Sequence, residues 1–325
     1  MANFKAIVKG NMIKNLPISV EDIERAEKIY GPDIYALKGK TTRKSPKPVV
    51  NDTITIPKEL LEKNYQVELC MDVIYVCGIP FLASIDKQVK YRSVVYLESK
   101  HSEDFYKALD MILRKYNKAG FVVNLIHCDR EFKPLMNEVI DNMEKVVMNY
   151  ANSLDHVPEI ERHNRTLKER FRAKYHLLPY KNLPKTLVKY LVFEECRALN
   201  FFSAKGGISK EYSPMTLIEN RNLDYKKHCL YPFGAFVQAR DEPNPLNTMA
   251  SHSLDCIYLR PVLDNVQGGH EVFNLQTKRV ITRLHVTEIP VPQRIIKLVE
   301  ELATQDKIKS FKFVLHSITG VDSML

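Results

Sequence analysis

The sequence lacks the segments that place a chain in a membrane or carry it across one. No run of ~18 apolar residues occurs, so we expect no membrane-spanning helix and no membrane partner. The first residues are not followed by the apolar stretch of a signal peptide. Internal repeats and low-complexity tracts are also absent. These absences predict a globular, intracellular protein.

Cysteine spacing gives no sign of disulfides or of a zinc site. The six cysteines include no Cys-x-x-Cys pair. Four of them lie inside apolar runs, which is typical of small core residues in a reducing compartment. We therefore expect free thiols that are mostly buried.

Positive charge is in excess. Lys and Arg number 48 against 39 Asp and Glu, which gives a net charge of +9. This balance favours a polyanionic partner, nucleic acid above all, although net charge alone defines no site. The apolar fraction of 45% is enough for a sizeable core, and the 325 residues fit two domains and an arm.

Residues 1–60 are predicted to form an N-terminal helical arm and a basic linker. Ser19 caps the helix and Gly31 ends it. The stretch from 38 to 47 is rich in cations and has no apolar period, so we expect an extended linker. It could contact DNA, serve as a nuclear localisation signal or simply be solvated. The linker cations expected to contact DNA are Lys40, Arg43 and Lys44.

Residues 61–205 are predicted to form an α/β core. Three strands come first, and helices then alternate with strands. The strands are expected at 65–76, 81–85, 92–97, 121–126 and 146–148, and the helices at 102–119, 134–142, 156–175 and 182–204. Three antiparallel strands followed by this alternation give a mixed five-stranded sheet with flanking helices, in the order of the ribonuclease-H-like fold.

Residues 206–325 are predicted to form a small C-terminal β-rich domain, either a barrel or a sheet. Its short β runs are expected at 233–238, 256–260, 271–275 and 279–286, before a terminal helix at 294–303.

The helix at 156–175 carries two stripes. Ile160, Leu167 and Phe171 form an apolar stripe that faces a core. The other stripe has a carboxylate near the helix start and cations below it: Glu161, Arg165, Lys168 and Arg172. This face could hold a metal ion beside a phosphate backbone, or it could be a solvated face with a Glu161–Arg165 pair.

Three carboxylates stand out by their positions. Asp72 lies inside the first strand, Asp129 follows the fourth strand, and Glu161 lies at the helix start. The first and fourth strands are neighbours in this fold, so Asp72 and Asp129 should approach each other. Carboxylates that share a site repel one another unless a divalent cation binds them. The arrangement suits two-metal phosphoryl transfer, although a strand-end Asp alone is more often a turn or cap residue.

The chain resembles the integrase region of copia-type LTR retrotransposons, which are relatives of retroviral integrases. The strongest match is residues 161–167, Glu-Arg-His-Asn-Arg-Thr-Leu, which is similar to the block around the third catalytic acid of that family. The stretches at Asp72 and Asp129 are similar to the first two catalytic blocks. Weaker matches follow in order at 212–214, 232–237, 256–259, 269–273 and 277–281.

This resemblance implies a function. Asp72, Asp129 and Glu161 would be the metal-binding catalytic triad, with two Mg²⁺ or Mn²⁺ ions. The enzyme would process DNA 3′ ends and join them to target DNA. Its partners would be element ends, target DNA and further copies of itself, in the nucleus or a cytoplasmic particle.

Some residues depart from the family pattern. Arg130 and Glu131 replace the Asn-Gly that usually follows the second acid, and the His-His-Cys-Cys zinc module is absent. Glu159 is a possible substitute for Glu161. The chain could therefore be a piece of a polyprotein or a partly decayed element. Two alternatives stay open, a catalytically silent DNA-binding remnant and a ribonuclease-H-type hydrolase.

Overall fold

The computed structural model describes most of the chain. The described residues are 2–10, 12–13, 15–39, 53–129, 132–133, 146–150, 158–241, 249–262, 268–308 and 313–315. They fall into two compact units. Unit 1 comprises residues 1–49 and 226–296, and unit 2 comprises residues 50–225 and 297–325. The N-terminal residues thus group with the second half of the chain, and the domain boundaries at 60 and 205 stay predictions.

Unit 2 contains the mixed sheet. Its strands are β1 (Gln66–Val76), β2 (Ile79–Asp86), β3 (Arg92–Tyr96), β4 (Val122–Cys128) and β5 (Val147–Tyr150), in the order β3-β2-β1-β4-β5. β1 to β3 are antiparallel, whereas β4 runs parallel to β1 and β5 parallel to β4. This order confirms the predicted ribonuclease-H-like α/β fold.

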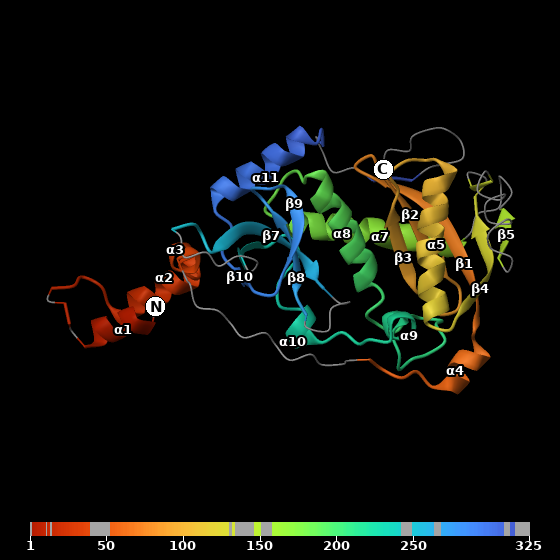
Figure 1. Cartoon of the computed structure of the whole chain (residues 1–325), viewed down its shortest axis with the longest axis horizontal. Helices are drawn as coiled ribbons and strands as arrows, with labels where there is room; N and C mark the ends of the chain where they lie inside the picture. Colours follow the sequence, from red (N-terminus) through yellow and green to blue (C-terminus); the bar gives the residue numbers. More distant parts are fainter. Residues whose placement is uncertain are drawn as a thin grey trace. The chain divides into compact units, whose positions relative to one another are not determined.

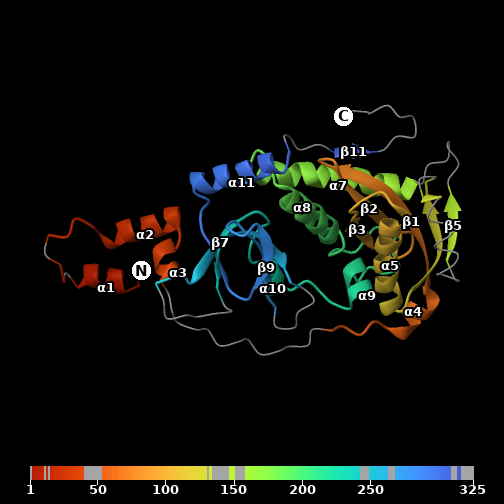
Figure 2. The same cartoon turned by 45° about the horizontal axis from the view of Figure 1, so that its top comes forward.

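Helices cover both faces of this sheet (Figures 1 and 2). α5 (Ser102–Lys118) lies on one face, and α7 (Pro158–Leu177) and α8 (Lys185–Ala198) lie on the other. The β1 residues that pack in the same core as α5 are Val67, Leu69, Met71 and Val73. Because side chains alternate along a strand, Glu68, Cys70 and Asp72 point to the α7 face.

α8 is shorter than predicted at both ends. It begins after Pro184, because the residue before a proline is disfavoured in a helix. Near its end, the side chain of Asn200 bonds the backbone N–H and C=O of Arg92, each at 2.8 Å. These bonds hold Asn200 at β3 instead of in a helix. The helix predicted at 134–142 lies outside the described residues.

Further elements of unit 2 are short. α4 spans Lys58–Lys63 and α9 spans Pro214–Glu219. A strand missing from the sequence prediction, β11 (Phe313–Leu315), pairs antiparallel with the end of β1 from Ile74 to Val76. The sheet therefore has six strands in all among the described residues.

Unit 1 contains an antiparallel five-stranded sheet. Its strands are β6 (Phe236–Arg240), β7 (Ser253–Pro261), β8 (His270–Asn274), β9 (Arg279–Arg283) and β10 (Val286–Glu288), in the order β10-β6-β7-β8-β9. The predicted run at 279–286 is in fact split between two strands that lie at opposite edges of the sheet. α10 (Tyr225–His228) and α11 (Gln293–Gln305) flank these strands in sequence, and α11 confirms the predicted terminal helix.

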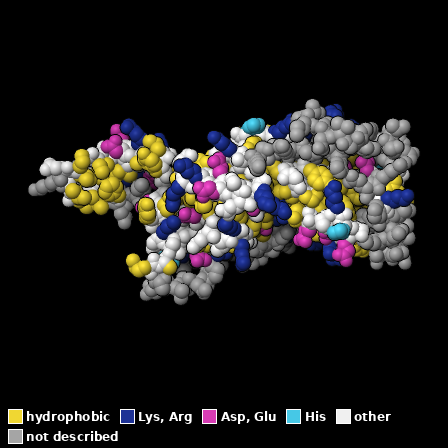
Figure 3. All heavy atoms as spheres, turned by 90° about the horizontal axis from the view of Figure 1, so that it is seen from above, with side chains coloured by type: hydrophobic (Ala, Val, Ile, Leu, Met, Phe, Trp, Pro, Cys, Tyr) yellow, Lys and Arg dark blue, Asp and Glu magenta, His cyan; other side chains and the backbone are white. Residues whose placement is uncertain are grey.

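The described N-terminal residues of unit 1 form three helices: α1 (Ala2–Lys9), α2 (Val20–Tyr30) and α3 (Ile34–Lys38). The predicted cap of α2 is confirmed, since Ser19 and Asp22 form a capping box and Gly31 ends the helix at a φ of 68°. Figure 3 shows hydrophobic side chains gathered over the N-terminal helical segment. They include exposed side chains at Phe4, Ile18 and Ile29.

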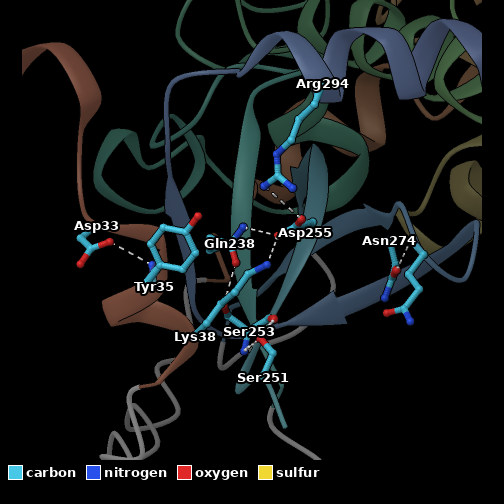
Figure 4. Close-up of polar contacts among 10 residues, drawn as sticks. Asp33, Tyr35, Lys38, Gln238, Ser251, Ser253, Asp255, Asn274 and Arg294 are labelled. Atoms are coloured by element: carbon cyan, nitrogen blue, oxygen red, sulfur yellow. Dashed lines mark hydrogen bonds and ion pairs between the residues drawn. The ribbon is translucent and has the colours of Figure 1, made fainter. Parts of the chain in front are cut away.

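α3 is joined to β7 by polar contacts (Figure 4). Lys38 Nζ lies 3.1 Å from Asp255 Oδ1, and the amide of Gln238 donates to the same carboxylate at 2.6 Å. The backbone N–H of His252 donates to the carbonyl of Lys38 at 2.9 Å. Lys38, the first cation of the predicted basic linker, is therefore committed to an ion pair within unit 1.

The thiols are free, as predicted. All six cysteines are unpaired, and Cys70, Cys128, Cys196 and Cys256 are buried. No helix in the described ranges combines the length and apolar character needed to cross a membrane.

Asp86 organises the turn between β2 and β3. Its buried carboxylate accepts hydrogen bonds from the four backbone N–H groups of residues 88–91 and, at 2.9 Å, from the hydroxyl of Tyr116 on α5. Burial raises the pKa of this carboxyl, although the donors around it act in the opposite direction. The turn and α5 are thus tied to one side chain.

We expect Asp86→Ala to lower the free energy of unfolding by at least about 3 kcal/mol, because it leaves several buried donors without an acceptor. Tyr116→Phe removes one donor and should cost about 1 kcal/mol. Chemical denaturation measures both. The control, Asp110→Ala, removes an exposed helix ion pair and should change stability by no more than about 0.5 kcal/mol. An Asp86→Ala chain as stable as this control would contradict the role of Asp86.

Candidate active site

Asp72 lies on the central strand β1, on the face that α7 covers. Its Oδ1 accepts the backbone N–H of Val73 at 2.7 Å. Its Oδ2 accepts a hydrogen bond from the side-chain amide of Asn164, on α7, at 2.6 Å. The carboxylate is therefore oriented by its own strand and by the helix above it.

Asp129 follows directly after β4. The parallel register of β1 and β4 ends at the pair Cys70–His127. Continued by two residues, this register sets Asp129 beside Asp72, and both side chains fall on the same face of the sheet. This extension of the register predicts that the two acids lie near one another, Asp72 within β1 and Asp129 just past the end of β4.

Glu161 is exposed and lies one turn before Asn164, on the same side of α7. Glu159 is half-buried, and its charge acts on Cys70 and Lys87 across the sheet face. Both acids lie in the first turn of the helix, as predicted, and α7 begins at Pro158. The geometry leaves both of them as candidates for a third acid.

The described residues contain no group of three or more His, Cys, Asp and Glu side chains arranged to hold a metal ion. Asp72, Asp129 and Glu161, all among the described residues, therefore do not form such a group in this structure. Beside Asp72, the buried Oδ1 of Asn164 has no hydrogen-bond partner in the part of the chain that the structure describes. Carboxylate and amide oxygens are the ligands that Mg²⁺ takes, often only one or two from protein, so these residues fit one hydrated divalent ion.

A second polar cluster lies on the same face, nearer the start of β1. Lys87 Nζ is 2.9 Å from Glu68 Oε2 and 3.0 Å from His127 Nε2. Hydrogen bonds from His127 and Lys87 lower the pKa of Glu68. The sequence analysis missed this cluster. Side-chain alternation could have revealed this cluster. Along β1 it places Glu68 on the same sheet face as Asp72, and along β4 it places His127 on the same face as Asp129.

The predicted basic stripe of α7 is accessible to solvent. Arg165 and Arg172 are exposed, and Lys168 is half-exposed. The apolar stripe of α7 is buried, as predicted, and consists of Ile160, Leu167 and Phe171. The linker cations Lys40, Arg43 and Lys44 lie outside the described residues.

Two observations limit other chemistry here. Burial raises the pKa of Cys70 and of Cys128 to about 12, so neither thiol is a nucleophile near neutral pH. His163 is 1% exposed, and burial lowers its pKa to about 3. Within the described ranges, neither ring nitrogen of His163 has a hydrogen-bond partner. It is a neutral packing residue next to Asn164 and not a general base.

The strand order places unit 2 in the ribonuclease-H-like class of α/β folds. Solved structures with low similarity include the catalytic core domain of BIV integrase, at 13% identity and a TM-score of 0.35, with 47% of this chain and 93% of that chain covered. The HTLV-2 integrase catalytic core domain, in complex with magnesium and in a trimeric form, matches at 13% identity and a TM-score of 0.34, with 48% and 97% covered. No protein-family profile and no curated protein sequence matches this chain. Similarity this low carries no argument about activity.

We expect the buried His163 to make stability fall in acid. Above pH 6.5 the ring is neutral in both states and has no effect. Below it, the unfolded chain binds a proton that the folded chain excludes, so stability falls by up to about 1.4 kcal/mol per pH unit, down to pH about 3.

Chemical denaturation at about pH 7 and pH 5 measures this effect. The free energy of unfolding of His163→Phe minus that of wild type should be about 2 kcal/mol larger at pH 5 than at pH 7. The exposed control, His101→Ala, should show no such gain. If this difference in unfolding free energy were the same at both pH values, folded His163 would not be excluding a proton, and the lowered pKa would be contradicted.

Proposed function

We propose that the chain is an integrase-like polynucleotidyl transferase that acts on DNA, with Asp72 and Asp129 as its metal-binding acids. The observation that carries the proposal is the hydrogen bond from Asn164 of α7 to Asp72 on β1. The parallel register of β1 and β4 supports it, because extending that register by two residues brings Asp129 next to Asp72. The resemblance of residues 161–167 to copia-type integrases supports it. Glu161 is proposed as the third acid.

In this proposal the residues around the acids position the reacting groups. Asn164 and the N–H of Val73 fix the direction of the Asp72 carboxylate. Asp72, Asp129 and Asn164 would hold one Mg²⁺ or Mn²⁺ ion, and Glu161 is proposed to contribute to a second. Such ions would supply activation of the attacking water or 3′-hydroxyl and stabilisation of the leaving oxygen. The exposed cations of α7 would contact phosphates without reading sequence. These cations are Arg165, Lys168 and Arg172, and the linker residues Lys40, Arg43 and Lys44 are proposed to add to them.

We expect the purified chain with Mn²⁺ or Mg²⁺ to nick and join labelled DNA ends. Asp72→Asn and Asp129→Asn should each reduce the rate at least ~100-fold, because each removes a charged metal ligand. The amide nearly keeps the shape of the side chain, so thermal unfolding should stay close to wild type. Undiminished cleavage by Asp129→Asn would reject the site.

The third acid is decided by a matched pair of variants in the same helical turn. We expect Glu161→Gln to lose activity at least ~100-fold, because Glu161 lies on the Asn164 side of α7. Glu159→Gln should lose less than ~10-fold, since its charge acts on Lys87 instead. The reverse result would identify Glu159, and not Glu161, as the third metal-binding acid.

A second candidate function is a catalytically silent DNA-binding protein. It is favoured by the lack of a three-ligand group among the described residues. This function predicts salt-sensitive DNA binding with no metal-dependent nicking, and nicking that is lost in Glu161→Gln would exclude it. Cleavage of RNA in an RNA–DNA hybrid, with duplex DNA left intact, would instead identify a ribonuclease-H-type hydrolase.

A further inference from the structure

Two lysines share one aromatic ring where α8 packs against the outer strand β3. Lys189 Nζ lies 3.2 Å from the ring centre of Tyr96, and Lys185 Nζ lies 5.6 Å from it. The lysines are one turn apart on α8, so they present their ammonium groups side by side. We call Tyr96, Lys185 and Lys189 the Tyr96 patch.

The cations of the Tyr96 patch have no carboxylate partner in the described ranges. Acids do lie close by, but they bond the backbone. Asp306 accepts the N–H of Lys185 at 2.7 Å, and Glu300 accepts the N–H of Lys181 at 2.9 Å. Two ammonium groups held near one ring repel each other. A bound anion between them would offset that repulsion.

Aromatic packing holds the ring of Tyr96 in place. Its edge-on neighbour is Phe81, with ring centres 6.1 Å apart, and Phe81 in turn packs edge-on with Phe193 of α8. One face of the Tyr96 ring is already covered by Lys189, so that face cannot stack on a nucleic-acid base. The patch therefore suits phosphate and not base recognition.

The Tyr96 patch lies on the same face of the sheet as the proposed acids. Tyr96 pairs with Phe81, and Phe81 pairs with Ile74, which is two residues beyond Asp72 on β1. Tyr96 is two strands away from β1 and level with Ile74, which is two residues along from Asp72. The Cα atoms of Tyr96 and Asp72 are therefore roughly 12 Å apart. Phe81 and Ile74, which lie between them, are fully buried beneath the helices of this face, so a nucleic acid that contacts the patch would pass outside those helices.

We propose that Lys185 and Lys189, held over Tyr96, bind the phosphate backbone of DNA independently of sequence. The identity of the ligand as DNA rests on the proposed function, whereas the anion site itself rests on the geometry of the patch. Each lysine neutralises one phosphate and releases the counterions condensed on it, so the contribution of the site appears in the salt dependence of binding.

The test measures the affinity of the full chain for duplex DNA over a range of salt concentrations, with no divalent metal present. In Lys185→Ala/Lys189→Ala the slope of log affinity against log salt should become shallower by about 1.8, and affinity at low salt should fall. Lys185→Arg/Lys189→Arg should keep the wild-type slope, since it keeps both charges. Tyr96→Phe should also keep it, because the ring and not the hydroxyl holds the lysines.

The matched control is Lys107→Ala/Lys118→Ala on α5, which removes the same charge from the opposite face of the sheet. Its slope should change by much less than that of the patch variant. A patch variant with the wild-type slope, a control that loses as much as the patch, or a wild-type chain that binds no DNA overturns the proposal. Because the assay needs no cleavage, undiminished cleavage by Asp129→Asn would reject the catalytic function and leave the phosphate site standing.

Discussion

The hydrogen bond from Asn164 to Asp72 is the contact on which the arrangement of the site depends. The apolar stripe of α7 is narrow, and polar His163 and Asn164 are buried beside it. Apolar packing alone would leave the rotation of this helix about its axis loosely specified. A short bond from a buried amide to a strand carboxylate fixes that rotation, because losing it would leave the buried Asn164 amide without its acceptor. The directions of Glu161 and of the α7 cations follow from it.

Charge is distributed unevenly along the sheet face under α7. Near the start of β1, the ammonium of Lys87 offsets the carboxylate of Glu68. At Asp72 the contact from α7 is made by an amide, which orients the carboxylate without adding positive charge. A carboxylate oriented by an amide in this way can still bind a cation, as the proposed function requires.

Much of the fold could be predicted because its signals are local. The alternation along β1 and the order of strands and helices are visible in short windows, and they led to the correct sheet order. The expected approach of Asp72 and Asp129 stays a prediction. Contacts between distant residues have no such signature. The pairing of β11 with β1, the ion pair of Lys38 with Asp255 and the two lysines over Tyr96 each join segments that no spacing rule connects. α8 likewise ends early because Asn200 bonds the backbone of a strand far away in sequence.

Each unit is built from two stretches of chain that the other unit interrupts. During synthesis the N-terminal helices emerge first, yet the strand that carries Asp255 follows only after the main stretch of unit 2. The sheet from β1 to β5 can therefore assemble while α1 to α3 still lack the strands they join. β11 arrives last among the described strands, and until then the edge of β1 from Ile74 to Val76 is uncovered beside the acid pair. Order of synthesis thus sets an order of folding, in which the sheet of unit 2 precedes both the unit that flanks it in sequence and the strand that completes its edge.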